Sequence, residues 1–98
     1  MNEIPVNIAI QLLPLCEKEK ALDYIDQAIT IIKHSGIKYE VGPFETTLEG
    51  DYNKIMNIVT SIKEEVLNSG ANDIIINLKI SASRVKLLSI DDKVNKYR

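Results

Sequence analysis

Hydrophobic residues alternate with polar or small residues in two stretches of the chain, residues 6–13 and residues 74–82. In both stretches the even-numbered residues are aliphatic: Val6, Ile8, Ile10 and Leu12, then Ile74, Ile76, Leu78 and Ile80. The odd positions are mixed. A period of two gives a β-strand one apolar face and one mixed face, so both stretches are predicted to be strands.

Two longer stretches have helical spacing instead. Over residues 19–35 the apolar stripe is Leu22, Ile25, Ala28, Ile29 and Ile32, and in the second helix it is Ile55, Ile58, Val59, Ile62 and Val66. Asp51 is a plausible N-cap for the second helix, and Gly36 supplies a left-handed residue after the first. Each stripe predicts a helix that packs one side against a core.

Shorter elements complete the order. Residues 37–41 and 46–49 read as two short strands, and Ser89 looks like the cap of a terminal helix over residues 90–97. The order is therefore β-α-β-β-α-β plus a C-terminal helix. We expect one α+β domain over residues 1–98, a ferredoxin-like sandwich with a four-stranded antiparallel sheet and two helices on one face.

Composition and charge narrow the classes of function. The net charge is −2, and lysines are interspersed with carboxylates rather than grouped, which argues against nucleic-acid binding. No apolar stretch is long enough for a membrane span. Cys16 is the single cysteine, so no intrachain disulfide can form, and we expect a reducing, cytoplasmic location.

Catalytic chemistry has little support. His34 is the single histidine and sits in the last turn of the first predicted helix, where a charged form suits the helix dipole. Cys16 has no second histidine to serve as its base. The sequence contains no metal-ligand motif and no glycine-rich phosphate loop. We therefore expect a non-enzyme without a cofactor or a metal.

The mixed strand faces point to binding. Two helices can cover one face of a four-stranded sheet, and the aliphatic faces must be the covered ones. The opposite face carries Asn7, Gln11, Asn77, Lys79 and Ser81, and Thr47 and Glu49 can join it. A face too polar for a core and too apolar for bulk water usually meets a ligand or a partner.

Residues 39–50 differ from the rest of the chain. They contain two of the four glycines, one of the three prolines and the single phenylalanine. A β-hairpin with a Gly-Pro turn explains Gly42 and Pro43. It does not explain the clustered hydroxyls and carboxylates of residues 45–49, so hairpin geometry and ligand contact are equally supported by the residues alone.

The same segment resembles the small thiamine-binding-protein family. The resemblance rests on the run Gly-Pro-Phe-Glu-Thr-Thr at residues 42–47, Glu49-Gly50 after it, the opening strand over residues 7–14, and residues 89–94. It covers nearly the whole chain. It implies a ferredoxin-like fold, a homo-oligomer (dimer or tetramer) built through the sheets, binding of thiamine or its hydroxymethylpyrimidine moiety, and no enzymatic activity.

The chemistry of such a ligand selects candidate site residues. A carboxylate can pair with a protonated aminopyrimidine, amides and hydroxyls can complete its edge, and aromatic rings suit a thiazolium cation. The candidates are Glu49 or Glu45 as carboxylate, Gln11 and Asn77 as amides, Thr46 and Thr47 as hydroxyls, Phe44 and Tyr39 as aromatics, and Lys79 beside the carboxylate. A simple Glu49–Lys79 cross-strand pair is the structural alternative for Glu49.

Four other functions compete with thiamine binding. A sensor of a different small effector shares the topology, and a pure assembly module without a ligand is also compatible with it. An RNA-binding domain of this topology stacks bases on aromatics of strands one and three, which are absent here. An acylphosphatase-like hydrolase needs an arginine in the loop after the first strand, and residues 13–18 contain none.

Overall fold

The computed structural model describes residues 4–98, and the predicted order of elements is confirmed. The strands are β1 (Val6–Pro14), β2 (Lys38–Val41), β3 (Thr46–Gly50) and β4 (Ile74–Ser81). The helices are α1 (Lys18–His34), α2 (Tyr52–Asn68) and the short α3 (Ile90–Val94), which continues as a 3-10 turn over Asn95–Tyr97. Most boundaries lie within one residue of the predicted ones, and the terminal helix is shorter than predicted.

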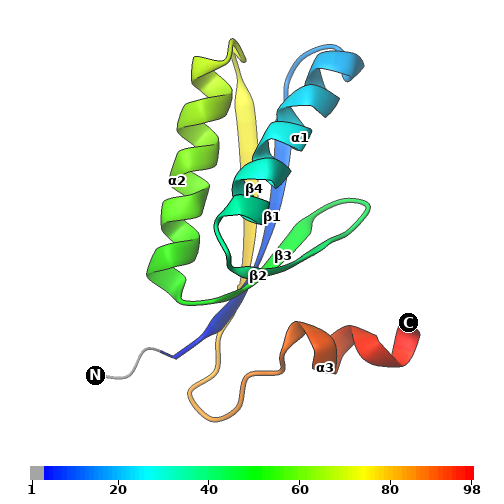
Figure 1. Ribbon diagram of the computed structural model, residues 1–98, viewed down its shortest axis with the longest axis vertical. Helices are drawn as coiled ribbons and strands as arrows, with labels where there is room; N and C mark the ends of the chain where they lie inside the picture. The colour runs from blue at the N-terminus through cyan, green and yellow to red at the C-terminus, as the bar shows by residue number, and fades with distance from the viewer. Residues whose placement is uncertain (1–3) are drawn as a thin grey trace.

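The four strands form one sheet in the order β2-β3-β1-β4, with every neighbouring pair antiparallel. Figure 1 shows α1 and α2 lying side by side across one face of this sheet. The ferredoxin-like fold is thus confirmed. Because β1 is central, it pairs with both β3 and β4, and Ala9 has Thr47 on one side and Lys79 on the other.

The core lies between the aliphatic strand faces and the two long helices. Its fully buried side chains are Ile8, Ile32, Leu48, Ile55, Ile62 and Val66. The stripe predicted for α2 is confirmed, but the stripe predicted for α1 is partly wrong. Leu22 is 51% exposed, whereas Tyr24 is 8% exposed. Tyr24, Ala28 and Ile32 follow each other at four-residue spacing, so they share one side of the helix and turn Leu22 outward.

Local capping chemistry accounts for the start of α2, the start of α3 and the end of α1. The Asp51 side chain accepts a hydrogen bond from the Lys54 backbone N–H at 2.9 Å, as an N-cap does. Ser89 and Asp92 form a reciprocal capping box at the start of α3. Gly36, which follows the α1 C-cap residue Ser35, has a φ of 79°, which favours glycine.

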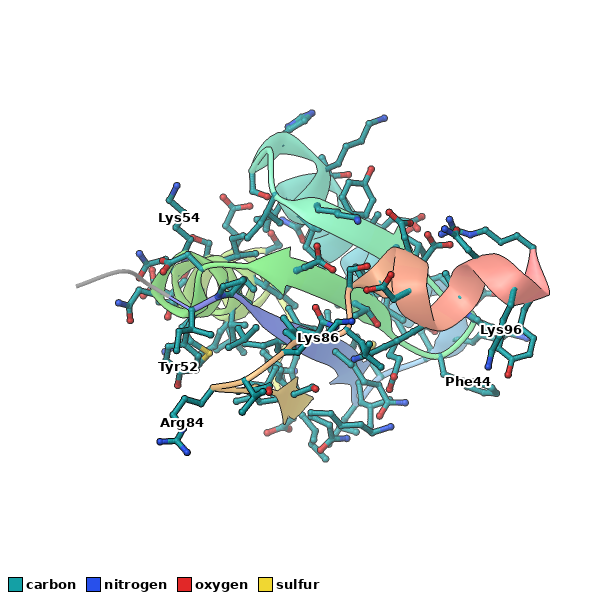
Figure 2. All side chains as sticks on the ribbon, turned by 90° about the horizontal axis from the view of Figure 1, so that it is seen from below. Phe44, Tyr52, Lys54, Arg84, Lys86 and Lys96 are labelled. Carbon is teal, nitrogen blue, oxygen red and sulfur yellow. The ribbon has the colours of Figure 1, made fainter. Side chains whose placement is uncertain are left out.

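The mixed face of the sheet is not fully open, in contrast to the prediction. The chain returns after β4 and lays α3 alongside the β2–β3 hairpin on this face (Figure 2). Asn7, which donates to the Leu88 backbone oxygen of the returning segment, is 3% exposed. Ile90 provides the apolar anchor for this arrangement, since it is 3% exposed.

Candidate functional site

The turn of the β2–β3 hairpin presents the most distinctive segment of the sequence. The Gly42 N–H donates to the backbone oxygen of Glu45 at 2.9 Å. A Cβ at Gly42 would stand 2.9 Å from the same oxygen, so the turn requires glycine. At the tip Phe44 is 82% exposed and points away from the body of the protein in Figure 2. An apolar ring held in solvent at a constrained turn is suited to contact a ligand or a partner.

A groove of about 560 Å³ lies between this hairpin, the mixed face of the sheet and α3. Its lining consists of Gln11, Glu40, Gly42, Pro43, Phe44, Glu45, Thr47, Lys79 and Val94. Strands β1, β3 and β4 supply Gln11, Thr47 and Lys79, and the hairpin turn supplies one side. Val94 is the one lining residue that comes from α3. The volume suits a small organic ligand.

Charge in the groove is balanced by weak ion pairs. Lys79 Nζ lies 3.2 Å from Glu45 Oε1, with the Lys79 side chain 79% exposed and the Glu45 side chain 34% exposed. The second carboxylate of the lining, Glu40, pairs with Arg98 near the end of the chain. An exposed pair of this kind contributes less than about 1 kcal/mol, so Glu45 can exchange Lys79 for a cationic ligand at little cost.

An amide lies on the strands beside these charges. Gln11 Oε1 accepts a hydrogen bond from Asn77 Nδ2 at 3.2 Å, and the two residues are register partners on β1 and β4. Gln11 lines the groove, whereas Asn77 is outside the lining and contacts the Gln11 side chain through this hydrogen bond. The groove therefore combines a carboxylate, an amide, a hydroxyl and an aromatic ring, the groups that can pair with a polar heteroaromatic ring.

Five of the nine predicted site residues line the groove: Gln11, Phe44, Glu45, Thr47 and Lys79. Tyr39 and Thr46 do not, because their positions alternate with those of the mixed face. Tyr39 is the register partner of Leu48, and its side chain packs against the core. Thr46 is the register partner of Ile10 and is buried.

Glu49 lies outside the groove lining as well. Its Oε1 accepts from the Ile90 backbone N–H at 2.6 Å, and its Oε2 lies 3.6 Å from Lys38 Nζ. The predicted Glu49–Lys79 cross-strand pair is wrong, because β1 separates β3 from β4. Four lining residues were not predicted as site residues: Glu40, Gly42, Pro43 and Val94. Gly42 and Pro43 belong to the predicted hairpin turn. Glu40 alternates with the core-facing Tyr39 and could have been found by period, but no local pattern places Val94 there.

The remaining reactive groups are scattered. His34 lies at the exposed end of α1, and Cys16 is an exposed free thiol before that helix. Across residues 4–98 no group of three or more His, Cys, Asp or Glu side chains could hold a metal ion. Over the same range, none of the helices has the length and apolar character needed to span a membrane.

Comparison with known proteins finds a matching family model and a relative that is similar over nearly the whole chain. Residues 8–98 match the model of a family described as thiamine-binding protein. A UPF0045 protein of Clostridium perfringens is 36% identical over 92 residues, which cover 94% of this chain and 96% of that protein.

Solved structures extend the comparison to three dimensions. A Thermotoga maritima protein assigned provisionally to thiamine biosynthesis or salvage matches with a TM-score of 0.87 and 34% identity, covering 96% of this chain and 99% of its own. A domain of unknown function from Bacillus cereus matches with a TM-score of 0.86 and 32% identity, covering 97% and 91%. The likeness thus extends over nearly the whole of each chain.

Proposed function

Since the chain belongs to the thiamine-binding protein family, we propose that it binds thiamine or its hydroxymethylpyrimidine moiety in the groove beside the β2–β3 hairpin. The observation that carries this proposal is the meeting of Glu45, Gln11 and Phe44 in one groove of about 560 Å³. We propose that the protein acts as a binding protein rather than as an enzyme, because the groove lining within residues 4–98 includes no histidine or cysteine to serve as a nucleophile or base.

Each group of such a ligand has a counterpart in the groove. A protonated aminopyrimidine donates from its ring nitrogen and its exocyclic amine, and the Glu45 carboxylate can accept both bonds. The Gln11 amide and the Thr47 hydroxyl lie in the same lining for the remaining edge. The thiazolium carries a positive charge, which the face of Phe44 and the carboxylates of Glu40 and Glu45 favour.

A thermal-shift titration tests the proposal. Purified protein is heated with thiamine, thiamine phosphates or hydroxymethylpyrimidine, with a neutral sugar as the negative control. A ligand at a hundred times its Kd stabilises the folded state by about 2.7 kcal/mol, which raises the Tm by several degrees in a domain of this size. No shift with any of these compounds at millimolar concentration would count against thiamine binding and in favour of a different effector or a pure assembly module.

We further propose that the protein works in the cytoplasm as a dimer or tetramer that pairs through its sheets. Leu13 and Ile75 are register partners on the mixed face, and both are exposed in the single chain. β4 is also an edge strand. Adjacent exposed aliphatic side chains on a sheet are typical of an interface. Light scattering at micromolar concentration tests this, and a mass of 11.0 kDa alone would contradict it.

A further inference from the structure

The C-terminal helix is attached to the sheet by polar contacts to three different strands. Glu49 of β3 accepts from the Ile90 N–H at 2.6 Å, and Asn7 of β1 donates to the Leu88 backbone oxygen at 2.8 Å. Lys38 of β2 donates to Asp91 at 2.7 Å. These contacts fix the first turn of α3 against the mixed face.

A second attachment holds the far end of the same segment. The Arg98 guanidinium pairs with Glu40 of β2 and lies 3.2 Å from Asp91. Arg98 also donates to Asn95 Oδ1 at 2.8 Å. The guanidinium thus closes the last turn onto the hairpin as well as onto α3 itself.

Val94 lies in sequence between the two attachments and lines the groove. It follows the buried Ile90 by four residues, so both side chains project from one side of the helix. The position of Val94 therefore depends on Glu49 at one end and Arg98 at the other, and neither of those two residues lines the groove.

We propose that Glu49 and Arg98 are positioning residues of the binding groove, which hold α3 so that Val94 forms one of its walls. The inference rests on the proposed function. A ligand that contacts Val94 binds the docked form of α3 alone, so ligand binding and helix docking strengthen each other by the same factor. Glu49, on this view, acts through Ile90 and makes no contact with the ligand.

Two measurements on the full chain test the proposal together: hydrogen exchange of the Ile90 amide, and calorimetric titration with thiamine. Glu49→Ala and Arg98→Ala should each speed exchange at Ile90, by roughly tenfold for Glu49→Ala because it removes a bond to a charged acceptor. Both should weaken thiamine binding. Glu49→Gln retains an oxygen that accepts from the Ile90 N–H, so it should restore most of both properties. Lys93→Ala, which removes an exposed charge from the same helix, is the matched control and should change neither.

The outcomes separate this inference from the proposed function. Faster exchange at Ile90 with unchanged thiamine affinity would overturn the role of α3 as a wall and leave thiamine binding intact. Unchanged exchange in both alanine variants would overturn the role of Glu49 and Arg98 in holding the helix. Wild-type protein that does not bind thiamine would refute the proposed function. In that case the NMR chemical shift of the Gln11 side-chain amide, measured without ligand, tests whether α3 forms a wall of the groove. A change of this shift in both alanine variants supports that role, and an unchanged shift overturns it.

Discussion

The Asn7 side-chain amide donates to the Leu88 backbone oxygen at 2.8 Å and so joins the start of β1 to the segment that leads into α3. Within residues 4–98 the Oδ1 atom of Asn7 is buried without a hydrogen-bond partner. A buried acceptor without a partner costs free energy, so the cover that α3 and its preceding segment place over β1 is held less firmly than its contacts suggest.

Substitutions at Asn7 should differ sharply in their effect on the free energy of unfolding. Asn7→Ala loses one bond and also removes the unpartnered oxygen, so we expect a cost of about 1 kcal/mol. Asn7→Asp places a carboxylate in a buried position opposite Glu49, its register partner on β3. It should cost about 3 kcal/mol or more. Urea denaturation measures both, and equal costs would contradict this account.

Glu45 should be the carboxylate that senses a cationic ligand. Glu45→Gln preserves size but removes the charge, and it should weaken thiamine binding by about tenfold, as expected for loss of a charge-assisted bond. Lys79→Ala removes the competing cation 3.2 Å from Glu45, so it should strengthen binding. Calorimetric titration should show a higher thiamine Kd for Glu45→Gln and a lower one for Lys79→Ala. If Glu49→Gln weakens binding more than Glu45→Gln does, Glu49 reads the ligand directly.

Docking of α3 should weaken in acid. The hydrogen bond from Lys38, followed by the charge of Lys38 and a smaller effect of Arg98, lowers the pKa of Asp91 below its ordinary value. A carboxyl with a lowered folded pKa stabilises the docked state above its unfolded pKa of about 3.9, and this contribution is lost as the pH falls through the folded pKa.

Hydrogen exchange or the chemical shift of the Ile90 amide should therefore change below about pH 4. Asp91→Asn is the control and should remove part of this dependence. It leaves Asp92, whose pKa is also lowered, in its case by the backbone N–H and hydroxyl of Ser89. A pH profile identical in the wild type and Asp91→Asn would contradict the role of Asp91.

The corrected face of α1 can be tested within one helix. Ile32→Ala removes a side chain that is 2% exposed and should cost about 2–5 kcal/mol of unfolding free energy. Leu22→Ala shortens an exposed side chain and should cost less than about 1 kcal/mol. The two variants share a helix and a similar change in volume, so the difference isolates burial. Comparable losses of unfolding free energy in the two variants would indicate that Leu22 is buried in the core, as the sequence pattern predicted.

The fold could be predicted from the sequence because each element carries its own periodic pattern. Residues 6–13 and 74–82 alternate, and Asp51 and Ser89 mark helix starts within a few residues of themselves. The face of α1 was misjudged because Leu22 and Tyr24 both fit an apolar stripe. The correct choice depends on which side meets the sheet.

The candidate site was less accessible to sequence reasoning. The hairpin turn and the mixed face of β1 placed Gln11, Phe44 and Glu45 near one another through strand alternation and turn geometry. The partner of Glu49 is the Ile90 N–H, 41 residues away, and no local pattern encodes where a terminal helix docks. The pairing of Lys79 with Glu45 was also not predictable from a local pattern, because it depends on the strand order and on the reach of the Lys79 side chain.

The separation of 81 residues between Asn7 and Leu88 has a consequence for the order of folding. Nearly the whole chain must be closed into a loop before this contact forms, whereas β1, β3 and the helices pair over shorter distances. We expect α3 to dock after the transition state. Substitutions that loosen it should then speed unfolding and leave the folding rate unchanged. In a chevron plot Arg98→Ala should raise the unfolding limb alone, while Leu48→Ala should move both limbs.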